Sequence, residues 1–258
     1  MAEKMKGKRG QVAIWVILAL ALVVSMVVFF TIESGKPIIS IGADKEFTPD
    51  SYIEKCVRNS VNEFVDAMIL HGGFIDDKNV KMYGGINVSY LCLTNGYYEP
   101  CINQHPMLLN EMEEEIKINI EPDVEDCFSD LQLELEDKNW DVSIGQMEID
   151  VSIVKKKIVL DVQRRVTISK DDTSQTFENF ESEVSSPLYD LANTAIEISN
   201  EEAKYCYFEY LGYMVTNSDI DIRKDSMSDS TKIYTLKDKK SGKEMNIAIR
   251  SCAIPPGI

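Results

Sequence analysis

The feature that most constrains this chain is an uninterrupted apolar run near its amino terminus. Residues 12–32 contain no charge, no proline and no glycine, and 14 of these 21 residues are Val, Ile, Leu or Phe. A helix rises about 1.5 Å per residue, so the run reaches roughly 31 Å, the thickness of the hydrocarbon core of a bilayer. The sequence therefore predicts a transmembrane helix over residues 11–32, with membrane lipid as its partner.

The charges before the run predict its orientation. The first ten residues contain four basic side chains and one acid: Lys4, Lys6, Lys8, Arg9 and Glu3. Basic flanks of a membrane span stay in the cytoplasm. We therefore expect residues 1–10 to form a cytoplasmic basic stub, and the rest of a single-pass plasma-membrane protein to be extracytoplasmic. The whole chain has a net charge of −16 and the stub contributes +3, so the remainder carries −19.

A cleaved signal peptide is the alternative to an anchor. Its apolar region usually spans about 7–15 residues, which is shorter than the run seen here. The triplet 19–21 (Ala-Leu-Ala) is similar to a small-residue cleavage site, but apolar residues continue beyond it to Phe30. Cleavage there would leave an exposed apolar segment at the start of an exported protein, so the sequence favours the anchor.

The segment from Lys8 to Ile14 (KRGQVAI) resembles the class III signals of archaeal type IV pilin-like proteins. In that family a peptidase cuts after a glycine that follows basic residues, and the mature chain begins with the apolar helix. The resemblance covers about the first 30 residues, and it implies processing between Gly10 and Gln11 and self-assembly at the cell surface. One departure is Ser34-Gly35-Lys36-Pro37, which disfavours a helix running directly into the head. An uncut signal anchor that displays one domain is therefore the other interpretation.

All six cysteines lie beyond the apolar run. An even number of cysteines in an exported domain predicts disulfides, whereas six reduced thiols would fit a cytoplasmic domain. Cys92 and Cys101 flank the turn signal Asn95-Gly96, which favours a local bridge. The remaining predicted pairs are Cys206 with Cys252 and Cys56 with Cys127, although six cysteines allow fifteen pairings.

The segment after the apolar run predicts a linker over residues 33–47 and one α+β domain over residues 48–258, made of helices and antiparallel sheet. Thr48-Pro49 is typical of a helix start, and Gly72-Gly73 is typical of its end. Further helices are expected from Pro106, from Pro122 and from Ser186-Pro187 to about Val215. Alternating apolar residues predict strands at 86–90, 147–153, 158–168, 176–184, 220–222, 232–236 and 245–250.

The residues that usually carry chemistry form no catalytic motif in this sequence. The two histidines, His71 and His105, have neither an HExxH nor a CxxC spacing around them, so we expect no metal site and no cofactor. The acidic segments 76–79 and 219–229 do not follow the calcium-binding EF-hand order. Asn87-Val88-Ser89 matches a glycosylation acceptor. The charge of −19 disfavours nucleic acid as a partner, and Lys155 to Lys157 are typical of a solvated turn.

These observations predict a non-enzymatic surface protein with a structural, adhesion or assembly role. Its partners would be proteins of the envelope or copies of itself. A membrane-anchored extracytoplasmic hydrolase is the alternative from another class, and it requires a pocket in which titratable groups converge. A subunit of a membrane complex is a third hypothesis, and it requires a sizeable exposed apolar patch.

Overall fold

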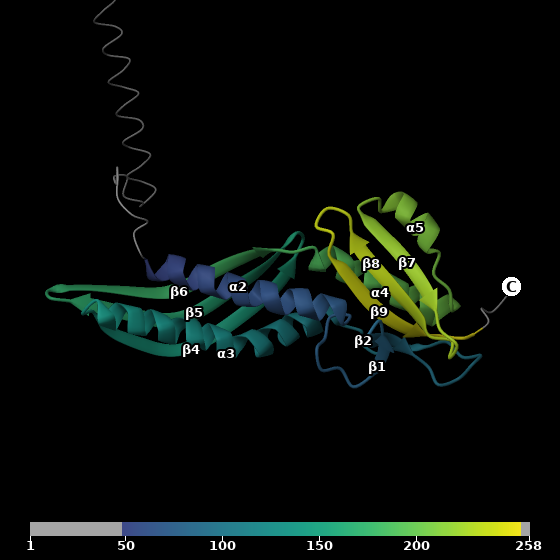
Figure 1. Cartoon of the computed structure of the whole chain (residues 1–258), viewed down its shortest axis with the longest axis horizontal. Helices are drawn as coiled ribbons and strands as arrows, with labels where there is room; N and C mark the ends of the chain where they lie inside the picture. Colours follow the sequence, from purple (N-terminus) through teal and green to yellow (C-terminus); the bar gives the residue numbers. More distant parts are fainter. Residues whose placement is uncertain (1–47, 254–258) are drawn as a thin grey trace, which may run out of the picture. The chain divides into compact units, whose positions relative to one another are not determined.

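Two helix-on-sheet layers, joined side by side, make up residues 48–253, the part of the chain that the computed structural model describes (Figure 1). In the first layer, α2 (Pro49–Leu70) and α3 (Leu108–Asp137) pack together against a three-stranded antiparallel sheet. The strands of that sheet follow one another in chain order, as β4 (Asp141–Val154), β5 (Lys157–Lys170) and β6 (Thr173–Ser185).

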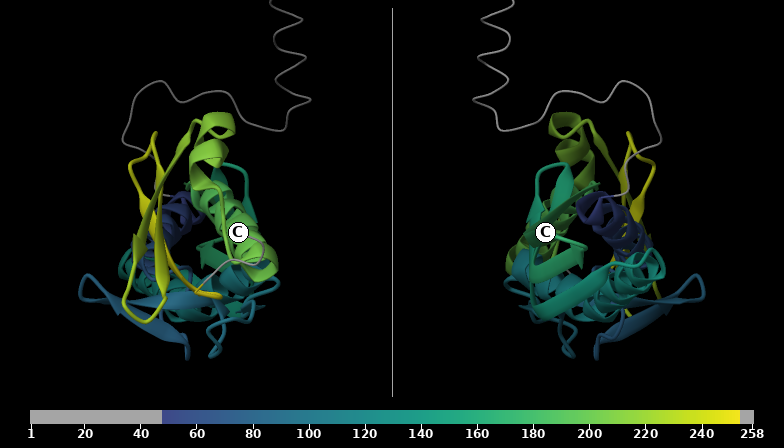
Figure 2. Two further views of the ribbon diagram at one scale, coloured as in Figure 1. Left: turned by 90° about the vertical axis from the view of Figure 1, so that its right-hand side faces the viewer. Right: turned by 90° about the vertical axis from the view of Figure 1, so that its left-hand side faces the viewer.

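The second layer is a mixed sheet with strand order β1-β2-β9-β8-β7, and the short β3 also pairs with β2. Its strands are β1 (Val80–Tyr83), β2 (Ile86–Leu93), β3 (Ile102–Asn103), β7 (Ile220–Ser226), β8 (Lys232–Asp238) and β9 (Glu244–Arg250). The helix α4 (Leu188–Tyr205) packs on this sheet, and α5 (Tyr210–Thr216) lies against β7. The two end views in Figure 2 show α2 and α3 on one side of the molecule and α4 and α5 on another.

The N-terminal predictions lie outside the described residues. They are the basic stub 1–10, the transmembrane helix 11–32, the linker 33–47 and the processing site Gly10 and Gln11. Within residues 48–253, no helix is long and apolar enough to cross a membrane. The mixed α+β character of the body is confirmed by its helices and two sheets.

The first predicted helix is present with the expected signals at both ends. The Thr48 hydroxyl accepts the backbone N–H of Ser51 at 3.3 Å, and Pro49 occupies the first helical position. Such a cap satisfies one of the donors left unpaired at a helix start. After His71, Gly72 and Gly73 both adopt positive φ angles, which end the helix because residues with a Cβ rarely adopt them.

Two helix boundaries differ from the predictions. Pro122 does not start a new helix, because it lies on the exposed side within the single 30-residue α3. Buried residues on either side of it, including Ile116, Ile120, Val124 and Phe128, continue one apolar stripe. Their burial outweighs a proline penalty of about 3 kcal/mol. The helix predicted to reach Val215 ends instead before Cys206, whose φ of +56° breaks it, and a separate α5 follows.

The second sheet is not wholly antiparallel, which corrects the prediction. Strands β2 and β9 pair in parallel, with Tyr90 opposite Ala248. Alternation along a strand tells which face is buried but not in which direction its neighbour runs. The chain between β2 and β9 runs through both sheets and all the helices after α2, so the direction depends on how these elements pack.

The structure joins the same three cysteine pairs that the sequence analysis selected. Cys56 of α2 is bonded to Cys127 of α3, with their Cα atoms 6.0 Å apart. Cys92 and Cys101 close the loop between β2 and β3, and Cys206 is bonded to Cys252 beyond β9. No free cysteine is left in the described part of the chain. The bridges therefore link helix to helix, β2 to the loop that precedes β3, and the end of α4 to the C-terminal segment.

Candidate functional site

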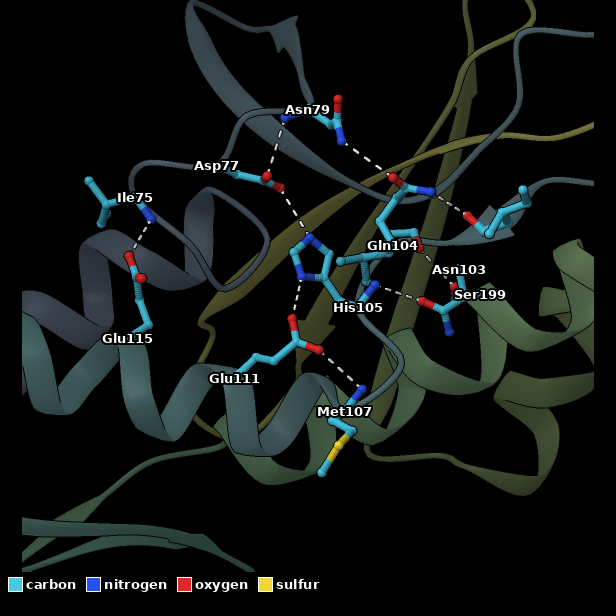
Figure 3. A network of polar contacts seen from close by, with 12 residues as sticks. Ile75, Asp77, Asn79, Asn103, Gln104, His105, Met107, Glu111, Glu115 and Ser199 are labelled. Carbon is cyan, nitrogen blue, oxygen red and sulfur yellow. Dashed lines mark hydrogen bonds and ion pairs between the residues drawn. The ribbon is translucent and has the colours of Figure 1, made fainter.

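The most concentrated polar network in Figure 3 surrounds His105, between β3 and α3. One ring nitrogen, Nδ1, lies 2.6 Å from Glu111 Oε2, and the other, Nε2, lies 3.2 Å from Asp77 Oδ2. The imidazole also stacks on Phe74, with the ring centroids 4.2 Å apart. Since both partners are carboxylates, both ring nitrogens act as donors, which is the hydrogen-bonding pattern of a protonated imidazolium. We call this group, Asp77, His105 and Glu111 with Phe74, the histidine clasp.

Three separate elements supply the clasp. Asp77 lies in the segment between α2 and β1, His105 follows β3, and Glu111 belongs to the first turn of α3. The backbone holds each carboxylate in place, because Asp77 accepts the N–H of Asn79 and Glu111 accepts the N–H of Met107. The clasp therefore joins the connection after α2 to the start of α3.

The electrostatics favour the charged form of the clasp. Burial lowers the pKa of His105, but the hydrogen bonds and negative charges of Asp77 and Glu111 outweigh burial, so the pKa of His105 is raised above its ordinary value. For Asp77, burial raises the pKa, but the hydrogen bonds from His105 and from the Asn79 backbone outweigh it, so the pKa of Asp77 is lowered. The two shifts agree in direction with an ion pair.

The same connection is held at two further points. Glu115, one helical turn beyond Glu111, accepts the N–H of Ile75 at 3.1 Å. At Gly72 the backbone passes so close to β9 that a Cβ atom there would lie 2.8 Å from the carbonyl oxygen of Asn246. The loop from Gly72 to Asp77 is thus fixed by one glycine, two glutamates and one histidine.

The clasp is better suited to holding a loop than to catalysis. A general base needs a free nitrogen lone pair that can receive a proton from a nucleophile. Both nitrogens of His105 are already engaged by carboxylates, and only 13% of its side chain is exposed. The arrangement can change with pH, since loss of the proton turns one donor nitrogen into an acceptor that faces a carboxylate.

A second polar group is buried beneath the end of α4. Glu202, which is fully buried, accepts hydrogen bonds from Lys232 at 2.6 Å, from the Tyr234 hydroxyl at 2.5 Å and from the Ser251 hydroxyl at 2.6 Å. Lys232 also donates to the carbonyl of Cys206. Burial and the adjacent Glu202 charge raise the pKa of Tyr234 far above its ordinary value, so the phenol stays a donor. This network ties β8 and the C-terminal segment to α4 beside the Cys206–Cys252 bridge.

The other residues singled out from the sequence lie apart from one another. Asn87 is exposed in β2, while Ser89 of the same triplet is 1% exposed. His71 follows α2, and its Nδ1 lies 2.7 Å from the carbonyl oxygen of Asn87. The aspartates of segment 219–229 bind separate lysines, since Asp219 pairs with Lys240 and Asp229 pairs with Lys81. Among residues 48–253, no group of three or more His, Cys, Asp or Glu side chains is placed to hold a metal ion.

No family model, no curated protein and no solved structure matches this chain.

The clasp was not predicted from the sequence, in which His105 was marked only by the lack of a metal-binding spacing around it. One signal was available, because Glu111 lies only six positions further on, in the first turn of the helix predicted from Pro106. Asp77 lies 28 positions from His105, and no local pattern connects them. Glu202 was also missed, because an acid within a helix is ordinarily solvent-exposed.

Proposed function

We propose that the protein is a single-pass membrane-anchored surface protein whose extracytoplasmic body has a structural, adhesion or assembly role rather than a catalytic one. The body would be residues 48–258, carried on a linker and an apolar helix. Its partners would be proteins of the envelope or further copies of the chain.

The pairing of all six cysteines is the observation that carries this proposal. Disulfides persist in oxidising compartments and are rare where thiols are kept reduced. The three pairs link segments separated by 71, 9 and 46 positions, so they cross-link several parts of the body and not one loop alone. This argument is independent of the charge asymmetry around residues 12–32, which leads to the same orientation.

The saturated histidine clasp supports the non-catalytic part of the proposal. Both nitrogens of His105 face carboxylates, and the buried Glu202 is fully engaged by Lys232, Tyr234 and Ser251. These ionisable groups bind each other and so strengthen the scaffold. A rigid scaffold of this kind suits a domain that presents a surface to a partner.

Protease digestion of intact cells tests the location. We expect added protease to remove the body while leaving an anchored N-terminal fragment, and peptide mapping without reductant to recover the three disulfide-linked pairs. A cytoplasmic control protein must survive in the same cells. If the body is protected until lysis, or if the cysteines are recovered as free thiols, the proposed location is wrong.

Mass spectrometry of the mature amino terminus separates the two variants of the proposal. A chain that begins at Gln11 supports pilin-like processing and assembly, whereas a chain that retains residues 1–10 supports an uncut anchor. Replacement of Gly10 by Val should block processing in the first case and leave the mature mass otherwise unchanged in the second.

A further inference from the structure

A cleft of about 760 Å³ lies between the turn that joins β4 to β5 and the second layer of the molecule. The first turns of α4, the end of α5 and the turn between β8 and β9 form its other walls. A volume of this size is typical of small-molecule sites. The cleft is separate from the histidine clasp, since the residues that line it come from other segments.

The lysines that line the cleft fall into two groups. Lys240 is neutralised by Asp219 at 2.6 Å, and Lys243 is paired with Asp66 of α2. Lys155 and Lys156 lie in the β4–β5 turn, and within residues 48–253 their side chains make no direct ion pair and no hydrogen bond. The pKa of Asp219 is lowered chiefly by the hydrogen bond and charge of Lys240, and the charge of Lys156 contributes to the same shift without a direct ion pair.

The next lysine, which begins β5, behaves differently. Lys157 forms an ion pair with Glu183 on the neighbouring strand β6. Glu183 is therefore engaged by Lys157, whereas Lys155 and Lys156 line the edge of the cleft on one side and lie near Glu181 on the other. The lining of the cleft carries four lysines and three aspartates, so positive charge slightly exceeds negative charge there, in contrast to the chain as a whole.

The remaining lining residues are mostly hydroxyl, amide and carboxylate groups. Asp190 and Asn193 lie on the first turns of α4, and Thr194 shares a hydrogen bond of 3.1 Å with the Tyr213 hydroxyl. An apolar ligand would separate these groups from water without pairing them, at a cost in free energy. Sugar hydroxyls both donate and accept, so they can pair with a carboxylate, an amide and a phenol together.

We propose that this cleft binds an anionic carbohydrate, that is, a sugar carrying a carboxylate, phosphate or sulfate group. Lys155 and Lys156 contact the anionic group, and Asp190 and Asn193 contact the ring hydroxyls. The proposal rests on the cleft alone, so it stands or falls independently of the membrane anchor and of the location of the body.

Isothermal titration of the full-length protein in a mild detergent tests this assignment. The probes are trigalacturonic acid, the neutral trisaccharide maltotriose and inorganic phosphate. We expect the acidic trisaccharide to bind at least tenfold more tightly than either of the others. Its affinity should also fall as salt is added, because ions screen exposed charges.

Two variants link the binding to the lysines. Lys156 has a φ of +72°, a conformation that Asn adopts more readily than most residues, so Lys155→Gln combined with Lys156→Asn removes both charges and preserves the turn. We expect this double variant to bind the acidic trisaccharide at least tenfold more weakly. Lys117→Gln on α3, far along the chain from the cleft, is the matched control and should bind like the native protein. Thermal unfolding checks that all variants remain folded.

Each outcome of the titration is decisive. No binding of the acidic trisaccharide, or equal binding by the double variant and the native protein, overturns the proposal. If maltotriose binds as tightly as the acidic trisaccharide, the lysines do not recognise the negative charge. If phosphate binds as tightly, the sugar ring is not recognised. Either of these results also contradicts the assignment.

Discussion

At the scale of single residues, buried charged side chains connect segments that are far apart in the chain. The histidine clasp connects the loop after α2 to α3, and Glu202 connects α4 to β8 and the C-terminal segment. In both groups the charged side chains depend on their partners, because burying an isolated charge away from water costs much free energy. Removing one partner should therefore cost more than removing an exposed ion pair.

The histidine clasp makes a prediction about pH. The pKa of His105 is raised in the folded protein, so its stabilisation is fully present below the unfolded value of about 6.5 and is lost as the pH rises through the folded value. The pKa of Asp77 is lowered, so its contribution is present above about 3.9 and is lost as the pH falls through the folded value. We expect native protein to exceed the His105→Gln variant in unfolding free energy by about 1–3 kcal/mol near pH 5.5.

Denaturant unfolding at a series of pH values measures this difference. The advantage of the native protein over His105→Gln should shrink steadily between neutral pH and pH 9. A difference that stays constant from pH 5 to pH 9 would mean that the charge of His105 does not contribute.

The buried glutamate makes a second prediction at the same scale. Glu202→Gln preserves the shape of the side chain but leaves Lys232 without its negative partner, and we expect a loss of about 2–4 kcal/mol in the free energy of unfolding. Glu244→Gln is a suitable control, because Glu244 pairs with Lys237 at the surface, where 41% of its side chain is exposed. That change should cost less than about 1 kcal/mol. Equal losses in the two variants, measured by urea unfolding, would contradict the structural role of Glu202.

At the scale of elements, the end of α2 is the position where backbone conformation and close packing coincide. Gly72 has a φ of +88°, and its α carbon faces the backbone of β9, which cannot move aside as a flexible side chain could. Gly84, in the β1–β2 turn, also has a positive φ of +59°, but a Cβ there would meet nothing within 4 Å. An alanine at Gly84 would therefore test the free-energy cost of the positive φ alone, and an alanine at Gly72 would add the cost of the clash with β9.

We predict that Gly72→Ala lowers the free energy of unfolding by about 2–4 kcal/mol, whereas Gly84→Ala lowers it by about 1–2 kcal/mol. The difference between them is the cost of pushing α2 away from β9. Calorimetric unfolding of the two variants measures it. If both variants lose the same free energy of unfolding, the close approach of Gly72 to Asn246 does not add to the cost.

At the scale of the whole molecule, each disulfide joins segments within one layer, with Cys56–Cys127 in the first and the other two bridges in the second. The Cys56–Cys127 bridge spans 71 positions, Cys206–Cys252 spans 46 and Cys92–Cys101 spans 9. Since a bridge stabilises mainly by restricting the unfolded chain, the two long loops should each contribute about 4 kcal/mol and the short one about 2.5 kcal/mol. Replacing each pair by alanines and measuring urea unfolding tests this order. The largest loss for the Cys92–Cys101 pair would contradict it.

Local patterns predicted most of the elements of the body. Thr48-Pro49 and Gly72-Gly73 marked both ends of α2, and alternation located β4, β5 and β6. The boundaries that were missed, at Pro122 and Cys206, are places where packing or a disulfide outweighs local preference. Local preference is worth a few kcal/mol at most, and a buried stripe of side chains exceeds it.

The sequence by itself determined the periodic helices and strands, the apolar run at residues 12–32, and the cysteine partners that lie close along the chain or on facing helices. These follow from spacing, which is a property of neighbouring residues. Only the tertiary structure decided that β2 runs parallel to β9, that His105 lies between Asp77 and Glu111, and that Lys155 and Lys156 line a cleft. Those features join residues far apart in the chain, and only the packing of complete layers brings such residues together.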